Sequence, residues 1–421
     1  MIAYSTPVAD CLHCGTLQRV PLVGSQGALD CAVCASPLQR TVARSNVAAL
    51  AFASATLLLL IPANLLPFLT TSIVGVSRQS RLVDSATAMW GDGFPELGIA
   101  IGLFVVVLPL LRCALMCAVL GALRLDPRPA WLGRAFRHAQ ALQVWAMADV
   151  FLLGFAIAWA RLETTISIDI GTGAWCFVAA AIGTLLMRAT LDAEAVWHAI
   201  GTPDDVRQTD REARRHPPSR SNQPPLVCTA CDLRAAADRA GSPCPRCGQR
   251  LHRRKPLSVA TTAAFAVAAA LLYVPSNLYP MATLPVGLQS EQYTVLEGVI
   301  DLWYVQLYGL AGLVFTASFA IPIAKLLVLA WCLQSVLRRS TRRLALKTRA
   351  HRVVEEIGRW SMVDPFVIAC FVPVTQYNAL LHGSAEAAAP MFTAVVILTT
   401  LAARCFDPRL MWDAANRQPD S

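Results

Sequence analysis

The sequence predicts an all-α polytopic membrane protein with two tandem four-helix transmembrane repeats, each preceded by a small cysteine-rich module. Composition is the first observation. Of the 421 residues, 55% are hydrophobic and 15% are charged, whereas about 25% of residues are charged in a typical soluble domain. The apolar residues also form blocks that reach the roughly 20 residues needed to cross a bilayer as a helix. Finally, Cys-x-x-Cys pairs lie in the hydrophilic segments outside these blocks.

Each repeat is preceded by two Cys-x-x-Cys pairs, in residues 1–45 and in residues 226–256, spaced C-x2-C-x16-C-x2-C and C-x2-C-x12-C-x2-C. The eight candidate metal ligands are Cys11, Cys14, Cys31, Cys34, Cys228, Cys231, Cys244 and Cys247. Each pair directs two thiolates to one point, and a second pair completes a tetrahedron that suits zinc. We therefore expect two rubredoxin-like zinc ribbons with structural zinc ions. Redox-active dithiols and an iron site remain the alternatives.

The apolar blocks occur in two groups of four. The first group lies in residues 46–191, at 47–69, 97–120, 142–160 and 170–190, and residues 192–225 form a linker rich in Pro, Arg and Asp. The second group lies in residues 257–410, at 257–280, 305–333, 357–381 and 388–406, and residues 411–421 form a tail. Eight membrane spans are therefore expected.

Matched residues indicate that the two groups arose by internal duplication. Pro62 matches Pro275 at an offset of 213, and Asp149 matches Asp364 at an offset of 215. With an even number of spans in each copy, both copies face the same way in the membrane.

The charges of the loops indicate the orientation. Seven basic residues lie between the sixth and seventh blocks, at 338–352, whereas the loop 282–304 has three acidic residues and no basic one. Positively charged loops stay in the cytoplasm, which places both termini and both cysteine modules there. Arg78 and Arg81 on the opposite side are the exception. The net charge of +9 follows from these loops, so we expect no nucleic-acid partner.

Charged residues within the apolar blocks are candidates for function, because hydrocarbon does not solvate them. Arg112 and Asp149 lie at similar expected depths, roughly 12 Å from the cytoplasmic side at about 1.5 Å per residue, and Lys325 and Asp364 repeat this relation. We expect each basic residue to pair with its acid. Such pairs would hold the bundle together or form a polar network that couples proton or substrate movement to conformational change. A third interpretation is that the basic side chains extend along the helix to the cytoplasmic membrane interface (snorkelling).

Asn64 and Asn277 lie in a repeated Pro-x-Asn-Leu-x-Pro element at the outer ends of the first and fifth blocks. Prolines interrupt a helix, and the asparagine amides are expected to cap the freed groups. The element marks either a helix end at the interface or a binding site at matched broken helices.

We expect no enzymatic activity. The chain lacks the GxxxxGK[ST] phosphate loop, the GxSxG nucleophile elbow and the HExxH zinc motif. Electron transfer by the Cys-x-x-Cys thiols is the remaining catalytic alternative.

Several independent motifs resemble the paraquat-inducible protein A family of Gram-negative inner-membrane proteins. They are the tandem cysteine modules before four spans, the Pro-x-Asn-Leu-x-Pro elements, the sequence Ser361-Met362-Val363-Asp364-Pro365-Phe366, and the sequence Phe406-Asp407-Pro408-Arg409-Leu410-Met411-Trp412. In the first repeat Ala146 replaces the motif serine. Any role of Ser361 is therefore expected in the second repeat alone.

The resemblance implies a multi-pass protein of the bacterial inner membrane that works with a periplasmic partner. Family members are typically encoded with a mammalian-cell-entry (MCE) domain protein that forms a tunnel across the periplasm, and the pair is associated with (phospho)lipid transport between the inner and outer membranes and with envelope integrity. The alternative is a non-transporting scaffold or oxidative-stress sensor that uses its cytoplasmic zinc and thiol modules.

Overall fold

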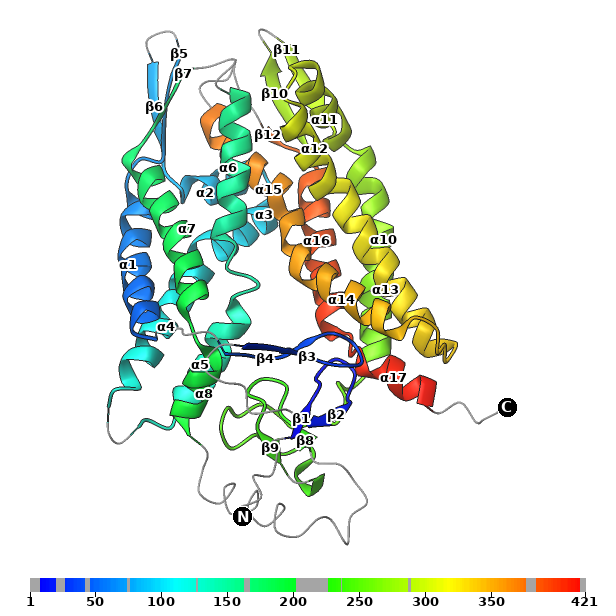
Figure 1. Ribbon diagram of the computed structural model, residues 1–421. Coiled ribbons are helices and arrows are strands. Elements are labelled where there is room, and N and C mark those ends of the chain that lie inside the picture. Colours follow the sequence, from blue (N-terminus) through cyan, green and yellow to red (C-terminus); the bar gives the residue numbers. More distant parts are fainter. Residues whose placement is uncertain are drawn as a thin grey trace, which may run out of the picture.

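The computed structural model describes residues 8–19, 27–41, 46–73, 76–125, 128–162, 167–201, 226–235, 237–286, 289–375 and 384–416. Its elements form three layers (Figure 1). Upright helices fill the middle, the cysteine modules lie at one end, and two small sheets lie at the other. We call these two ends the ribbon side and the sheet side. Helices of the first half and helices of the second half stand next to each other (Figure 1).

Six helical stretches of the described residues are long and apolar enough to cross a membrane. Four are single helices from one end to the other: α1 (Asn46–Leu65), α7 (Thr172–Thr190), α10 (Ser258–Leu278) and α16 (Ala388–Cys405). The remaining two stretches, Pro95–Ala122 and Tyr308–Leu337, each contain a wider turn in the middle.

The expectation of eight full-length spans is met for these six. The block expected at 142–160 forms the 15-residue helix α6 (Ala148–Leu162), and the block expected at 357–381 forms the 13-residue helix α15 (Val363–Thr375), preceded by the 3₁₀ turn η4 (Gly358–Met362). Consequently Asp149 lies in the first turn of α6, where the positive end of the helix dipole favours a carboxylate. Asp364 is the second residue of α15, but the chain runs helically from α14 through η4 into α15, so Asp364 does not face a free helix end.

A π-helical turn occurs at the same place in each half. The first half contains α3 (Pro95–Ile101), the π turn η1 (Gly102–Val107) and α4 (Leu108–Ala122), and the second contains α12 (Tyr308–Phe315), η3 (Thr316–Ala320) and α13 (Ile321–Leu337). Pro109 and Pro322 follow directly, as the second residues of α4 and α13. A proline ring clashes with the carbonyl four residues earlier in a regular helix, and a wider turn relieves that clash.

Four amphipathic helices lie on the ribbon side: α5 (Leu132–Leu142), α8 (Ala193–Ile200), α14 (Leu344–Ile357) and α17 (Arg409–Asn416). Two of them correct the expected boundaries. Helix α8 occupies residues assigned to the linker, and α17 extends to residue 416 of the expected tail. Both helices bury side chains, including Val196 in α8 and Met411 in α17, so they belong to the folded core.

The sheet side contains two three-stranded antiparallel sheets that the sequence did not predict. Strands β5 (Leu69–Ile73), β6 (Val76–Ser80) and β7 (Ser167–Ile170) form the first in the order β6-β5-β7. Strands β10 (Ala282–Val286), β11 (Gln289–Tyr293) and β12 (Ser384–Ala385) form the second in the order β11-β10-β12. Two short helices, α2 (Asp84–Gly91) and α11 (Val295–Tyr304), connect them to the spans. A capping box between Thr294 and Glu297 begins α11.

The two halves meet where α6 packs against α15, in the centre of the molecule (Figure 1). Gly154 of α6 makes this contact close, because a β-carbon there would lie 3.0 Å from Phe366 Cβ and 3.2 Å from the Val363 carbonyl oxygen of α15. Phe151 and Phe366 meet edge to face across the same interface, with their ring centroids 5.6 Å apart.

We expect Gly154→Val to destabilise the protein because its side chain does not fit between α6 and α15. Overpacking of this kind typically costs about 1–3 kcal/mol, which thermal unfolding of the detergent-purified chain would detect. Gly121→Ala is the matched control, because a β-carbon at Gly121 of α4 has no heavy atom within 4 Å. Equal unfolding midpoints for Gly154→Val and the wild-type chain would contradict the close contact.

Candidate functional site

Each cysteine module brings four thiols together. In ribbon 1, strands β1 (Val8–Asp10), β2 (Leu17–Arg19), β3 (Gly27–Asp30) and β4 (Pro37–Thr41) form two hairpins that place Cys11 Sγ 3.5 Å from Cys34 Sγ. In ribbon 2, strands β8 (Leu226–Val227) and β9 (Arg234–Ala235) and the turn η2 (Ala237–Arg239) bring Cys228 Sγ to 3.5 Å from Cys247 Sγ. All eight cysteines are buried.

These distances fit a tetrahedral metal site. Within each cluster the four sulfur atoms lie within 4.8 Å of one another. A tetrahedron with metal–sulfur bonds of about 2.3 Å has sulfur–sulfur edges of roughly 3.8 Å. A disulfide needs about 2.05 Å, and all fourteen cysteines are free. The two clusters can therefore bind metal ions, as expected from the sequence.

The backbone of each cluster is shaped for such a site. The residue after the second cysteine of each pair has a positive φ, at Gly15 (76°), Ala35 (53°), Asp232 (56°) and Gly248 (71°). Its N–H donates to the carbonyl of the first cysteine, for example from Gly15 to Cys11 at 2.8 Å. The thiols also polarise one another. The hydrogen bond between Cys11 and Cys14 lowers the pKa of Cys14 and raises the pKa of Cys11, so Cys14 is the thiol of this pair that is more readily the thiolate a metal needs.

The ribbons dock crosswise. Ribbon 2, which precedes the second half in sequence, packs on the first half, where its cysteines share a hydrophobic cluster with Phe136 of α5 and Trp197 of α8. Gly133 of α5 is essential to this contact, because a β-carbon there would lie 1.9 Å from the carbonyl oxygen of Arg246. The Arg246 guanidinium donates to the carbonyl of Gly201 at 3.1 Å.

Ribbon 1 packs on the second half instead. Trp412 of α17 lies against its four cysteines and donates from its indole N–H to the hydroxyl of Thr348 in α14 at 3.2 Å. Trp197 and Trp412, matched in sequence, thus contact opposite ribbons. The two modules thereby tie the two halves together on the ribbon side.

A buried ion pair holds the base of α17. Asp407 and Arg409 are joined by two side-chain hydrogen bonds of 3.0 Å, and the Lys255 N–H donates to Asp407 at 3.2 Å. Burial alone would raise the pKa of Asp407, but the hydrogen bonds from Arg409 outweigh it, so the pKa lies below its usual value. Ser258 at the start of α10 accepts from the Asp407 N–H at 2.8 Å.

Nearby, His351 of α14 is buried against Phe406, with ring centroids 5.2 Å apart. Its Nε2 is 3.1 Å from the Ala403 carbonyl oxygen, to which it donates. Burial lowers the pKa of His351 to about 4, so this histidine is neutral in the folded protein near pH 7.

The second half contains a buried polar network. Lys325 of α13 is 1% exposed, and its ammonium donates to Ser361 Oγ at 3.1 Å and to Thr399 Oγ1 at 3.2 Å. Gly358 makes room for it, because a β-carbon there would lie 2.5 Å from Lys325 Cε. Ser318 of the π turn η3 hydrogen-bonds to the Asp364 carboxylate.

The expected pairing of Lys325 with Asp364 is therefore wrong: among the described residues the two form no ion pair. The two side chains have different partners: Asp364 contacts Ser318 of the π turn η3, whereas Lys325 contacts Ser361 of η4 and Thr399 of α16. The expected pairing of Arg112 with Asp149 is also wrong. Asp149 pairs with Arg359 of η4 at 2.9 Å and with Arg188 of α7 at 3.6 Å.

The two asparagines occupy equivalent positions in the last turns of α1 and α10. Asn64 donates to the Leu60 carbonyl and Asn277 to the Tyr273 carbonyl, each at 2.7 Å. These carbonyls lie two residues before Pro62 and Pro275, whereas a proline frees the carbonyl four residues before it, so the capping of freed groups stays a prediction. The side-chain oxygens of both are buried without a hydrogen-bond partner. The helices pass through Pro62 and Pro275 and end before the second proline of each element.

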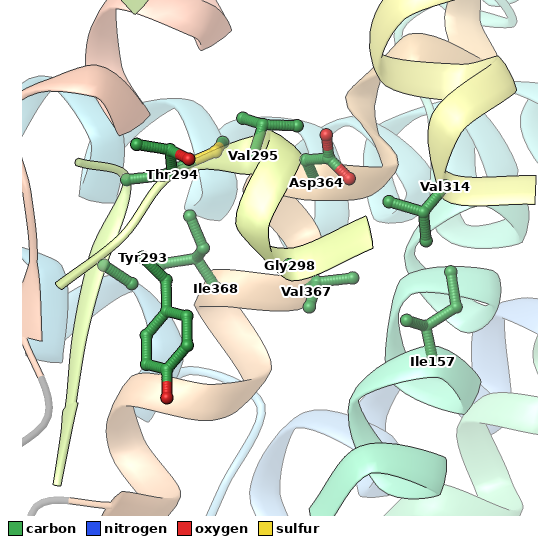
Figure 2. A pocket seen from close by; sticks show the side chains of 11 residues that line it. Ile157, Tyr293, Thr294, Val295, Gly298, Val314, Asp364, Val367 and Ile368 are labelled. Atoms are coloured by element: carbon green, nitrogen blue, oxygen red, sulfur yellow. The ribbon is translucent and has the colours of Figure 1, made fainter. Parts of the chain in front are cut away.

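Asp364 also lines a mostly apolar cavity of about 70 Å³ on the sheet side, between the halves. Figure 2 shows its lining residues, with Asp364 as the only carboxylate. They come from both halves: Ile157, Met281, Ala282, Tyr293, Thr294, Val295, Gly298, Val314, Asp364, Val367 and Ile368. Ile157 belongs to α6, and the others to the second half. The cavity is small beside the roughly 300–1,000 Å³ of pockets that enclose drug-sized ligands.

Sequence reasoning missed Ser318, Thr399, Arg188 and Arg359 as parts of these networks. The twin position of Ser318 in the first half is Val105, so the repeat gave no signal for it. Arg188 and Arg359 lie near the ends of apolar blocks, where basic residues are common.

The six membrane-spanning stretches and the two four-cysteine clusters define a polytopic membrane protein with two metal-binding modules. The sequence model of the family described as "Paraquat-inducible protein A" matches residues 47–201 and 259–416. The chain belongs to the paraquat-inducible protein A family.

Curated relatives agree over nearly the whole length. The chain is 29% identical over 416 residues to the "Intermembrane transport protein PqiA" of Escherichia coli (strain K12), covering 98% of this chain and 96% of the relative. It is 29% identical over 409 residues to the "Lipophilic envelope-spanning tunnel protein A" of the same organism, covering 96% and 91%. A "Probable intermembrane transport protein" of Haemophilus influenzae is 23% identical over 421 residues, covering 98% and 97%. No solved structure matches the chain.

We expect the purified chain to contain two metal ions, because each cluster offers four converging sulfur ligands. Elemental analysis by mass spectrometry should give one ion fewer for Cys14→Ser, one fewer for Cys247→Ser and none for the double variant. Cys117→Ser, which alters a cysteine outside both clusters, should leave two. A wild-type chain without bound metal would contradict the assignment.

Stability should fall as the pH decreases from about 6.5 to about 4. His351 is protonated in the unfolded chain below its ordinary pKa of about 6.5, but stays neutral in the fold until about pH 4. The unfolded state therefore binds more protons in this window, and up to about 3 kcal/mol is lost. In His351→Gln the loss between these pH values, measured by thermal unfolding, should shrink. His198→Gln, at an exposed histidine, should behave as wild type, and an unchanged pH dependence in His351→Gln would contradict the burial.

Proposed function

We propose that the protein is the inner-membrane component of a system that moves (phospho)lipids between the bacterial inner and outer membranes and supports envelope integrity. The observation that supports this most is the apolar cavity at the junction of the two halves, with a single carboxylate in its wall. The names of the relatives point the same way, since two are called intermembrane transport proteins. A transport role, and no enzymatic activity, follows from this proposal.

The ribbon side is proposed to face the cytoplasm, with both termini there, and the sheet side to face the periplasm. The basic loops support this orientation, because Arg338, Arg339, Arg342 and Arg343 lie next to α14 on the ribbon side. We also propose that residues 46–201 and 258–416 are two copies of one unit. The order of spans, π turn, amphipathic helix, short helix and final span is the same in both.

Zinc is the proposed occupant of both clusters. Four buried cysteine sulfurs around one point match a structural zinc site, which is closed to further ligands. The reducing cytoplasm keeps such thiols available for metal. When bound, each ion would fix the two hairpins of its ribbon, and the ribbons would hold the halves together through Trp197 and Trp412.

A lipid chain is proposed to enter the sheet-side cavity when α6 and α15 separate. The cavity is too small for a phospholipid in the present arrangement, but its wall includes Ile157 of α6 and Val367 and Ile368 of α15. Any movement of α6 away from α15 therefore enlarges it. Helix α11, which contributes Val295 and Gly298, covers it beside the second sheet.

The buried charges would couple this movement to protonation. Ser318 has one hydroxyl hydrogen but two neighbours that accept it, the Val314 carbonyl oxygen at 2.7 Å and the Asp364 carboxylate. An ionised Asp364 takes the hydrogen from Ser318, whereas a protonated Asp364 donates its own and leaves Ser318 bonded to Val314. Protonation at the cavity wall is thereby transmitted to α12, which also lines the cavity through Val314.

A periplasmic MCE-domain tunnel protein is the proposed partner. One relative is named an envelope-spanning tunnel protein, and a lipid leaving the cavity on the sheet side would need a shielded path across the periplasm. The two small sheets and α11 are the parts of the chain available for that contact.

The alternative is a membrane scaffold or oxidative-stress sensor without transport. The crosswise docking of the ribbons supports this alternative. Each ribbon precedes one half in sequence and packs on the other, so loss of its metal would alter contacts of both halves. A scaffold, however, has no need for Lys325 and Asp364 inside the bundle, since placing a charge within the membrane costs at least about 2.5–3.5 kcal/mol.

Filling the cavity should abolish function. We expect Val314→Trp to lose envelope protection, measured as detergent resistance of cells in which the variant replaces the native protein, because the indole occupies the cavity. Leu313→Trp is the matched control, since Leu313 is the neighbouring residue on the exposed face of α12, and it should remain functional. Normal protection by Val314→Trp at wild-type abundance would contradict a lipid site in this cavity.

A further inference from the structure

Three arginines of different elements gather around one carboxylate on the ribbon side, at the boundary between the halves. Asp149 pairs with Arg188 and Arg359. Arg112 of α4 lies within electrostatic range of all three. Three positive charges thus face one carboxylate at close range. Glu356 of α14 also lies within electrostatic range of Arg188, but it is exposed and makes no ion pair among the described residues.

Arg112 is the member that most lacks a partner. It is 2% exposed, and its Nε is buried without a hydrogen-bond acceptor. Leaving a buried charged group unsatisfied is costly, typically more than the 1–3 kcal/mol lost at a neutral donor. Its one hydrogen bond, from the guanidinium to Gln143 Oε1, is long at 3.4 Å.

Gln143 cannot satisfy both neighbouring arginines with its carbonyl oxygen. With the amide turned over, that oxygen accepts from Arg188 at 3.1 and 3.2 Å, and the Arg112 guanidinium then faces the amide nitrogen, which is a donor. In either orientation one guanidinium keeps unused donors directed into the cluster. The one carboxylate within ion-pair distance among the described residues, Asp149, faces three guanidinium groups, so a second negatively charged acceptor is lacking.

We propose that this cluster, formed by Arg112, Arg188 and Arg359, binds a phosphate-bearing anion. Guanidinium groups match phosphate oxygens in two-point hydrogen bonds, and a phosphate would supply the acceptors that Arg112 Nε and the spare donors lack. The side chains of Arg188 and Arg359 are 28% and 16% exposed, so the anion would reach the cluster past these two arginines. Arg112 forms the buried end of the site.

The position gives two sources for the phosphate. Arg188 lies in the last turn of α7 and Arg359 in η4, just before α15, at the proposed cytoplasmic boundary of the membrane. The head group of an anionic phospholipid or free phosphate could occupy it. Because Arg359 belongs to the second half and the other two arginines to the first, the bound anion would join the halves below the α6–α15 contact. The site is separate from the sheet-side cavity, and its test does not depend on transport.

Native mass spectrometry of the full chain in detergent tests this site. With phosphatidylglycerol as probe and phosphatidylcholine as the zwitterionic comparison, we expect the wild-type chain to bind phosphatidylglycerol at least about 5-fold more tightly. Arg112→Gln and Arg188→Gln should weaken that binding about 10-fold or more, which corresponds to about 1.4 kcal/mol. Arg124→Gln, at an exposed arginine beyond the end of α4, is the matched control and should bind as wild type.

Asp149→Asn should change the affinity for phosphatidylglycerol in the opposite direction from the arginine variants. It removes the carboxylate that competes with the anion, so it should tighten binding several-fold. This variant also keeps the test decisive if the arginine variants fold poorly, because poor folding does not tighten binding. In parallel, inorganic phosphate should raise the unfolding temperature of the wild-type chain and displace the lipid if free phosphate is the ligand, and should do neither if the ligand is a head group. Equal affinity of wild type and Arg112→Gln, or weaker binding by Asp149→Asn, would overturn the proposal.

Discussion

The cost of placing charges and backbone polar groups in hydrocarbon governs this structure. A lipid environment offers no partners for them, so each must find one inside the protein. Asp149 satisfies this requirement at the first turn of α6, where the helix dipole assists, and through its arginine partners. Asp364 accepts a hydrogen bond from Ser318. Lys325 donates to two hydroxyl groups.

The same constraint explains how the halves are held together. In the centre they meet through close helix packing at Gly154 and through phenylalanine rings, and on the sheet side the Ala385 N–H of the second half donates to the Asp92 carboxylate of the first at 3.3 Å. Nearer the ribbon side they meet through Asp149 and Arg359, and beyond the helices through the crosswise ribbons. The ion pair and the crossed ribbons make the ribbon side the more strongly joined end of the interface. A separation of α6 from α15 can open the cavity while these contacts remain in place.

Much of this could be predicted from the sequence, and the limits have physical reasons. Apolar blocks located the spans, and cysteine spacing identified both clusters, because these signals are local. The matched positions of the two halves identified Arg112, Lys325, Asp149 and Asp364 as candidates. Their partners, however, depend on the rotation of each helix about its axis, and the expected depth of a residue in the membrane does not determine that rotation. The π turns before Pro109 and Pro322 change that rotation and direct Ser318 to Asp364. The two sheets and the crossed ribbons rest on contacts between distant segments, for which single-sequence patterns give no signal.

We propose that the buried charges of the second half take part in transport and do more than hold the bundle together. The direct measurement is the rate at which radiolabelled phospholipid leaves the inner membrane in cells whose only copy is Asp364→Asn, normalised to the amount of folded protein. We expect transport to be lost while the protein stays as abundant and as thermally stable as wild type, and Asp364→Glu to retain partial transport. Wild-type transport by Asp364→Asn, or a loss no larger than its loss of folded protein, would contradict it.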